Sequence, residues 1–276
     1  MDSIEGGILM IENIIVLLLM FAVYAVLGWV TEVVFFALKT GEFVNRGFLN
    51  GPVCPLYGFG VVGVVILMSP VQDNTVLLFL GSMVFCTLIE FITGLVLKYL
   101  FHDTWWDYSE EPFNIGGYVC LRFSIMWGLA CVGVIRLLHP AVSDVIAVTP
   151  RWLQIVLICI FYVYAAADLT VTVRGINKVN RALREIAESA RNISDSAGNL
   201  IYEAAMTVDE VKDRGEARTD AYIAFLSDSR LKKHRRLLKA FPTLRQSFKE
   251  RLIDGAGEEL RAQIEEYFDK RFKKGD

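Results

Sequence analysis

Two glutamates lie inside long apolar stretches of this chain, and their side chains have the chemistry of an acid, a base or a ligand for a cation. Glu32 ends the segment LGWVTE, and Glu90 lies in the segment CTLIEFITG. A carboxylate inside a lipid bilayer costs roughly 2.5 to 3.5 kcal/mol on lenient insertion scales, so it normally faces protein, water or a partner charge. We therefore expect Glu32 and Glu90 to belong to a buried polar site.

Two polar segments supply candidate partners for the glutamates. KTGEFVNRGFLNGPVCPLYG covers residues 39–58, and FHDTWWDYSEEPFNIGG covers residues 101–117. The planar guanidinium of Arg46 suits a carboxylate or a phosphate, and Glu32 or Glu90 could be its partner. Two interpretations stay open: the ion pair fixes the packing of the first three helices, or the same groups form a pocket that binds an anionic or amine-bearing substrate.

The candidate cluster also includes a cysteine in an irregular loop. Gly and Pro around Cys54 prevent a regular backbone, and irregular backbone at membrane depth is tolerated only inside protein or against a wet cavity. Cys54 could act as a nucleophile only if His102 were its partner. The complete set of predicted substrate-binding or structural residues is Glu32, Asn45, Arg46, Cys54, Tyr57, Glu90, Trp106, Asp107, Tyr108, Asn114 and Arg122.

Several members of this set have ordinary roles beside the functional one. Trp106 and Tyr108 fit an aromatic belt at a membrane boundary. Asp107 and Asn114 could cap helix starts or bond the irregular loop, and Arg122 could pair with a carboxylate or snorkel to the surface. The HDTWWD segment lacks metal-ligand spacing, so we predict no metal site and assign no catalytic residue.

The composition places the chain among membrane proteins. Of its 276 residues, 54% are hydrophobic and the mean hydropathy is +0.43, which a soluble domain of this length would struggle to keep in solution. Residues 1–173 hold the long apolar runs, whereas residues 174–276 hold 22 of the 28 Lys and Arg. We therefore predict a transmembrane helical domain over 1–173 and a cytoplasmic helical tail over 174–276. The five cysteines show no paired spacing, which favours small buried side chains over a disulfide framework.

Five apolar segments could cross the bilayer, for which about 20 residues are needed. They cover roughly residues 14–38, 56–68, 75–100, 119–138 and 152–173. The second segment is short and lies between Pro55 and Pro70, so it is either a thin span or a re-entrant piece. The expected fold is an all-α polytopic membrane helix bundle of about five spans with a C-terminal cytoplasmic helical tail.

The distribution of basic residues predicts the orientation in the membrane. Lys and Arg concentrate on cytoplasmic flanks, and the tail after Arg174 is the most basic flank of the chain. The fifth span should therefore end inside, and counting back through five spans puts the N-terminus outside. Both polar segments then face the cytoplasm, and Glu32 and Glu90 lie in the inner third of their helices.

The tail carries two patterns that bear on partners. Apolar residues alternate spacings of three and four from Ile176 to Ile193, which fits either a homodimer through 174–193 or a helix that folds back on later tail helices. RLKKHRRLLK, residues 230–239, is strongly basic and could bind anionic lipid head groups or pair with acidic neighbours. Because it has no aromatic interleaving and no recognised module, we do not expect nucleic-acid binding.

A series of motifs occurs in one order along the membrane part: LGWVTE, NRGFLNGPVCPLYGFG, CTLIEFITG, WWDYSEEPFNIGG, CLRFSIMWG and finally HP at Pro140. This series resembles the bacterial membrane family described as "putative ABC transporter type IV" permeases, over roughly residues 21–140. The resemblance implies a permease-like component of an ABC transport system in the bacterial inner membrane, without establishing its solute. Tyr118 departs from the family versions, which tend to carry an Arg at this place.

The sequence has no GxxxxGK[ST] segment, so ATP hydrolysis would belong to a separate ATPase subunit, and no cofactor is implied. Membrane lipid is the other expected partner. Two alternatives remain beside a transport component for an unknown small solute. One is a membrane enzyme that acts on a lipid or lipid-linked head group at the cytosolic face, with Glu32, Glu90 or Asp107 as acid or base. The other is a membrane sensor or scaffold with the helical tail as its output.

Overall fold

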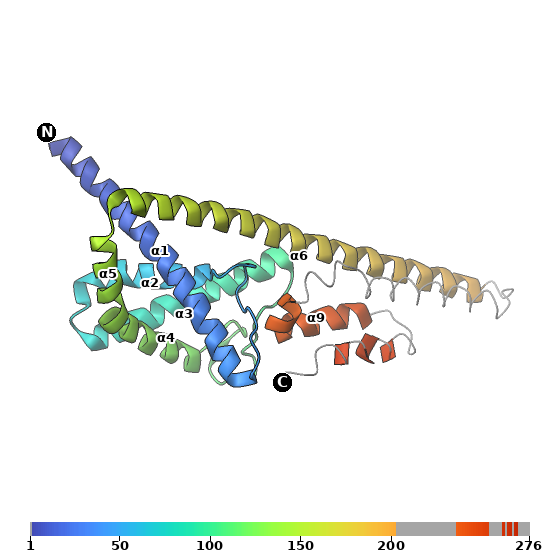
Figure 1. Cartoon of the computed structure of the whole chain (residues 1–276). Helices are drawn as coiled ribbons and strands as arrows, with labels where there is room; N and C mark the ends of the chain where they lie inside the picture. Colours follow the sequence, from blue (N-terminus) through green and yellow to red (C-terminus); the bar gives the residue numbers. More distant parts are fainter. Residues whose placement is uncertain (1, 203–235, 254–260, 263, 267, 270–276) are drawn as a thin grey trace. The chain divides into compact units, whose positions relative to one another are not determined.

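The computed structural model describes most of the chain (Figure 1). The residues outside the description are 1, 203–235, 254–260, 263, 267 and 270–276. Side chains are described from residue 12 onward, apart from those at 179 and 182–202. The basic run predicted at 230–239 therefore lies mostly outside the described residues, although 236–239 are helical.

The described residues are helical almost throughout, as the apolar runs predict. The helices formed by these runs include α1 (Asp2–Thr40), α3 (Thr75–Phe101), α4 (Leu121–Gly133), α5 (His139–Val148) and α6 (Arg151–Tyr202). Four helical stretches are long and apolar enough to cross a membrane: Glu12–Thr40, Thr75–Phe101, Leu121–Val148 and Arg151–Lys178. The prediction of an all-α, membrane-type helical fold is thus confirmed.

The second predicted span is a shorter apolar helix. α2 (Pro55–Met68) continues into the 3-10 turn η1 (Ser69–Val71), and at the usual rise per residue the stretch is about 27 Å long. This is slightly less than the roughly 30 Å of a hydrocarbon core. Pro55 lies at the helix start, where its missing N–H interrupts no hydrogen bond. α2 packs against both α1 and α3, so it is a wall of the bundle whether or not it crosses completely.

Large apolar side chains cover the outside of the long helices. Phe35, Val84, Leu129 and Val163 are 60% to 72% exposed. Contiguous exposed apolar surface is rare on a soluble monomer, whereas lipid tails accept it. The outer surface therefore fits insertion into a membrane.

The chain divides into two compact units. The first contains Met1–His102 and Trp106–Thr172, and the second contains Asp103–Trp105 and Val173–Asp276. The boundary near residue 173 follows the change in composition. The three residues 103–105, in contrast, come from the polar loop after α3 and belong with the tail.

Within the first unit, α1 and α2 approach closely because each offers a glycine to an aromatic ring of the other. A Cβ added at Gly28 of α1 would overlap the Tyr57 ring of α2. A Cβ added at Gly58 of α2 would lie 2.8 Å from the Phe21 ring of α1. Small residues permit this packing in membranes, where helices gain little from hydrophobic association. Tyr57 is thereby held against α1 at Gly28, and Gly28 lies one helical turn before Glu32.

Two contacts connect α3 to α4. On each helix the two residues that make them are four positions apart. Cys86 and Glu90 share one face of α3, and Trp127 and Cys131 share one face of α4. The Sγ atoms of Cys86 and Cys131 are 3.5 Å apart, and Trp127 Nε1 donates to Glu90 at 3.0 Å. The two helices therefore run antiparallel, with two consecutive cross-links one turn apart.

The fourth predicted span does not end at residue 138. α4 continues through a five-residue π-helical turn, η2 (Val134–Leu138), into α5. Pro140 has no N–H for the carbonyl of Arg136, and in a regular helix its ring would clash with that carbonyl. The π turn absorbs this defect, so the helix passes through Pro140 and ends at Val148.

A short hairpin precedes α4 where the sequence predicts helix from residue 119. β1 (Asn114–Ile115) pairs antiparallel with β2 (Val119–Cys120). Gly116 and Gly117 have φ angles of 60° and 75°, left-handed values that glycine adopts at no steric cost. The helix therefore begins at Leu121, later than predicted.

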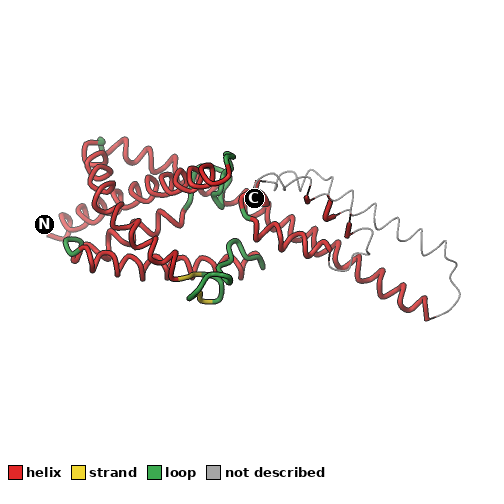
Figure 2. The backbone as a smooth tube through the Cα atoms, turned by 90° about the horizontal axis from the view of Figure 1, so that it is seen from below, coloured by secondary structure: helices red, strands yellow, loops and turns green. Residues whose placement is uncertain are grey.

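The two polar segments lie at the same end of the first unit, where Figure 2 draws their loops in green. The rings of Phe48 and Phe101, one from each segment, have centroids 5.8 Å apart. Arg151 and Glu12 pair at 3.2 Å at the opposite end of α1 and at the start of α6. The polar residues predicted to share one face of the membrane thus share one end of the helices.

The second unit buries a charged residue of the polar loop. The side chain of Asp103 is fully buried, and Arg251 Nη2 and Ser247 Oγ of α9 (Pro242–Ile253) donate to it at 2.5 Å and 2.9 Å. Trp105 meets Phe241 edge-on, with ring centroids 4.9 Å apart. Asp103 and Trp105 are therefore part of the core of the tail unit.

The apolar seam predicted from Ile176 lies on α6, which continues without a break to Tyr202. Ile176 is 7% exposed, whereas most later side chains of the seam lie outside the description. The homodimer through 174–193 and the folded-back helix both stay predictions.

Replacing Arg251 by Ala is expected to destabilise the second unit. Buried Asp103 would keep Ser247 but lose its charged partner, at a cost of about 1.5–3 kcal/mol. Hydrogen exchange of the α9 amides in the full chain should become about 10- to 100-fold faster. Gln246→Ala is the matched control, because Gln246 bonds exposed Glu250 on the same helix. Equal exchange in both variants would contradict the role of the ion pair.

Candidate functional site

Arg46 pairs with Glu32. Its Nε lies 3.3 Å from Glu32 Oε2, and the two side chains are 27% and 28% exposed. The guanidinium also lies over the ring of Phe36, 5.0 Å from its centroid and one turn further along α1. Of the two partners that the sequence leaves open, the structure gives Glu32. This contact ties the loop after α1 to the end of that helix.

Tyr57 connects the ion pair to the middle of the bundle. Its hydroxyl donates to Glu32 Oε1 at 2.7 Å, so the two oxygens of Glu32 face Tyr57 and Arg46. The Tyr57 ring meets Trp127 edge-on, with centroids 5.5 Å apart. Since a half-buried charge needs partners on its oxygens, these contacts explain how Glu32 is accommodated.

Glu90 is the more deeply buried carboxylate, at 5% exposure. Tyr108 donates to its Oε1 at 3.2 Å, and Trp127 donates to its Oε2 at 3.0 Å. Two donors suit an ionised carboxylate, which can only accept. Among the residues that the structure describes, no Lys, Arg or His forms an ion pair with Glu90. The carboxyl group of Glu90 is hydrogen-bonded but has no cationic partner from the described residues.

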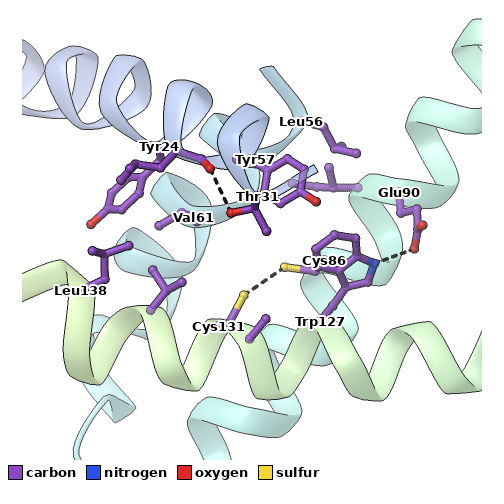
Figure 3. A pocket seen from close by; sticks show the side chains of 16 residues that line it. Tyr24, Thr31, Leu56, Tyr57, Val61, Cys86, Glu90, Trp127, Cys131 and Leu138 are labelled. Atoms are coloured by element: carbon purple, nitrogen blue, oxygen red, sulfur yellow. Dashed lines mark hydrogen bonds between the residues drawn. The ribbon is translucent and has the colours of Figure 1, made fainter. Parts of the chain in front are cut away.

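A cavity of about 180 Å³ lies beside Glu90 within the first unit (Figure 3). Its walls come from α1, α2, α3 and the stretch of α4 and η2. Glu90 is the only charged residue among the described residues that line it. The other polar groups in the wall are Tyr24, Thr31, Tyr57 and Trp127, together with the thiols of Cys86 and Cys131. Glu32 and Asp107 do not line this cavity.

Tyr108 reaches Glu90 because the loop before α4 holds it there. Its backbone N–H donates to the Gly117 carbonyl at 2.9 Å, and its ring stacks on Phe123 with centroids 4.7 Å apart. Burial, and after it the Glu90 carboxylate, raise the pKa of Tyr108 well above its ordinary value. The hydroxyl therefore stays protonated and remains a donor.

Asp168 of α6 holds the loop that carries Arg46. Its two oxygens accept from the backbone N–H of Asn50 at 3.1 Å and from that of Gly51 at 2.7 Å. The side chain of Asn50 adds bonds to Asp168 at 2.9 Å and to Thr172 at 2.7 Å. Asp168 is 9% exposed, so these donors compensate a buried carboxylate while they fix the loop.

Asn45 organises the same loop from within. Its Oδ1 accepts from Trp29 Nε1 at 2.7 Å and from the backbone N–H of Gly47 at 2.9 Å. Its Nδ2 donates to the carbonyl of Asn50 at 2.7 Å. Asn45 is therefore a loop-building residue, and none of its atoms lines the cavity.

Cys54 is poorly suited to nucleophilic chemistry. Its backbone N–H donates to the Ala25 carbonyl at 2.9 Å, which places it just before α2. Burial, and to a lesser degree the Glu32 carboxylate, raise the pKa of the Cys54 thiol to about 12. Since the thiolate is the reactive form, little of it exists near neutral pH.

The remaining predicted residues bond within the loop after α3. Asp107 Oδ1 accepts from the N–H and the hydroxyl of Ser109, at 2.8 Å and 2.5 Å. Asn114 donates to the carbonyls of Ser109 and Glu111 and accepts from Gly117. These are the loop bonds that the sequence offered as one alternative.

Trp106 and Arg122 also act locally. Trp106 Nε1 donates to the Tyr118 carbonyl at 2.9 Å, which anchors the hairpin turn. Arg122 is 67% exposed and pairs with Glu111 at 3.2 Å. Neither residue lines the cavity, so the predicted cluster separates into a site around Glu90 and a set of loop-building residues.

The sequence interpretation missed several residues of the site. Trp127 lies within the motif CLRFSIMWG, but its role as a donor depends on the register of α3 and α4. Asp168 lies in the apolar run YAAADL, and the rule that singled out Glu32 and Glu90 would also have found it. Tyr24 Oη lies 2.8 Å from His139 Nδ1, a contact that no spacing in the sequence indicates.

Residues 19–173 match the model of the family described as "Putative ABC-transporter type IV". The chain belongs to this family. No curated protein and no solved structure matches the chain. Family membership and four membrane-length apolar helices fit a component of a membrane transport system. The matched residues include Glu90, both polar segments and Asp168, and they exclude most of the second unit.

Replacing Asp168 by Ala should loosen the loop that carries Arg46. Asn50 and Gly51 would lose their acceptors, at a cost of about 1.5–3 kcal/mol. Hydrogen exchange at the amides of Asn50 and Gly51 should accelerate by at least tenfold in the purified chain. Asp144→Ala, an exposed acidic residue of α5, is the control. Unchanged protection in the Asp168 variant would show that the loop is held by other contacts.

The thiol of Cys54 should react slowly with N-ethylmaleimide. With a pKa of about 12, its thiolate fraction at pH 8 is roughly a thousandfold below that of an ordinary thiol. Because the raised pKa lies far above this range, the rate should rise about tenfold for each pH unit between 7 and 9. Peptide mass spectrometry after timed labelling gives the rate, with the denatured chain as the reference. Rapid, pH-independent labelling in the folded chain would refute the assignment.

Proposed function

We propose that the chain is the membrane-embedded, permease-like component of an ABC-type transport system and that the cavity beside Glu90 is its solute site. One observation carries the proposal: a buried carboxylate without a cation from the described residues forms part of a cavity wall that is otherwise uncharged. Carboxylates within the membrane commonly mark substrate or ion pathways. The match to the transporter family over residues 19–173 supports the same function.

The cavity favours a small solute. Apolar cavities of about 150 Å³ accept a benzene-sized molecule, so about 180 Å³ admits roughly seven to eight non-hydrogen atoms. Side chains such as Val61 and Leu138 give the wall its apolar area. A solute with a compact hydrocarbon body would therefore fit better than a sugar or a peptide.

Glu90 favours a solute with a cationic group. Each of its oxygens accepts one hydrogen bond from the protein and keeps capacity for another. An ammonium group supplies both donors and the compensating charge, and charge-assisted hydrogen bonds are about twice as strong as neutral ones. Of the two substrate classes that the sequence leaves open, small apolar amines thus suit this cavity better than anions.

The proposed orientation follows from the basic tail, with the N-terminus outside and residues 174–276 in the cytoplasm of a bacterial inner membrane. The loops that hold Tyr108 and Arg46 then lie on the cytoplasmic side.

An ATPase would act from the same side, and a separate subunit must supply it because the chain has no nucleotide-binding motif. Purification in mild detergent from the native host should recover such an ATPase. Repeated recovery of the chain without it would contradict the ABC assignment.

Replacing Glu90 by Gln is expected to abolish the preference for amines. Benzylamine, which is protonated at pH 7, should bind the chain in lipid nanodiscs, and its Kd should rise by tenfold or more in the Glu90→Gln variant. Toluene has the same ring without the charge, so its binding should change by less than threefold. Saturation-transfer NMR with both probes provides the comparison.

Glu12→Gln is the matched control for this experiment. Glu12 is a half-exposed carboxylate at the opposite end of α1, where it pairs with Arg151. Its replacement should leave the binding of both probes unchanged. Equal loss of benzylamine binding in the Glu12 and Glu90 variants, or no binding of either probe by the unmodified chain, would overturn the proposed solute site.

A further inference from the structure

Cys86 and Cys131 form a close pair of thiols that the proposed transport function does not use. Their Sγ atoms are 3.5 Å apart, within hydrogen-bond distance for sulfur, and both residues line the cavity (Figure 3). Cys86 is half-buried on α3, and Cys131 is buried on α4. Residues 45 positions apart in sequence are thus brought together by the antiparallel register of the two helices.

We propose that Cys86 and Cys131 are a redox-active dithiol, which a hydroperoxide oxidises to a disulfide that joins α3 to α4 in the cavity wall. A disulfide has an S–S length of about 2.05 Å, so the sulfur atoms must approach by about 1.5 Å. Rotation of the side chains and a small shift of the helices supply this movement.

The neighbouring contacts hold the two thiols in position for this disulfide to form. Glu90 and Trp127 bond across the same helix pair one turn away, and this contact keeps α3 and α4 in register. Gly128 gives a further close contact, because a Cβ there would lie 2.8 Å from the ring of Phe79. The two thiols are therefore held opposite each other by contacts on the same faces of the helices.

The reaction balances with hydrogen peroxide as the oxidant. One thiolate attacks a peroxide oxygen, so an S–O bond forms, the O–O bond breaks and water leaves after proton transfer. The second thiol then attacks the sulfenic sulfur, so the S–S bond forms, the S–O bond breaks and a second water leaves. Two thiols and one peroxide give one disulfide and two waters, with two electrons passing from sulfur to oxygen.

The cavity is large enough for this oxidant. Its volume of about 180 Å³ is several times the roughly 30 Å³ that a water molecule occupies in the liquid. Hydrogen peroxide is little larger than water. A disulfide at this place would connect two walls of the cavity beside Glu90. A thiol could reverse it by exchange through a mixed disulfide.

The experiment uses the full chain in lipid nanodiscs, treated with hydrogen peroxide and then with N-ethylmaleimide. Peptide mass spectrometry is expected to find Cys86 linked to Cys131 within one chain, two fewer free thiols than before, and full reversal by dithiothreitol. A variant that replaces the other three cysteines, Cys54, Cys120 and Cys159, by Ser should form the same link.

Single variants keep the test decisive. In Cys86→Ser and Cys131→Ser the remaining thiol should be trapped by dimedone as sulfenic acid, without a link, while helix content and elution volume match the unmodified chain. The proposal is wrong if both thiols stay free when Cys159 is already oxidised. It is equally wrong if either thiol pairs with a different cysteine, or if dibromobimane, which bridges adjacent thiols, fails to connect them.

Discussion

The bundle can bury Glu90 only because two donors from different elements meet at its carboxylate. Tyr108 comes from the loop after α3, and Trp127 comes from α4. A buried carboxylate that loses one donor bears a desolvation cost of a few kcal/mol, so neither contact is optional. The hairpin that holds Tyr108 and the register of α3 against α4 must therefore form together. The hydrogen bonds of Glu90 and the packing of α3 against α4 therefore depend on each other.

The long helices could be predicted because lipid leaves the backbone few alternatives. Without water to bond exposed N–H and C=O groups, an apolar run of about 20 residues must be helical, and the four long stretches follow this rule. The predicted ends of the fourth span were wrong because local backbone features, which apolar composition does not reveal, determine them. Pro140 usually ends a helix, but the π turn before it removes the clash, and Gly116 with Gly117 builds a hairpin where apolar composition alone indicates helix.

The candidate site could be predicted as a set of residue types but not as a set of contacts. The cost of intramembrane charge singles out Glu32 and Glu90 without any geometry. The choice of Glu32 as the partner of Arg46 depends on how the loop folds back, and Asp168, which is distant in the sequence, holds that loop. Asp107 bonds Ser109, two residues away, because its short side chain finds a local donor before a distant one.

The π turn after Gly133 has a geometric consequence for the molecule. It contains one residue more than a regular turn, and each residue of a helix corresponds to about 100° of rotation. Before the turn Cys131 meets α3, and after it His139 meets Tyr24 of α1. This change of phase lets a single helix present its polar side chains to two different neighbours, so one wall of the cavity is continuous from α3 to α1.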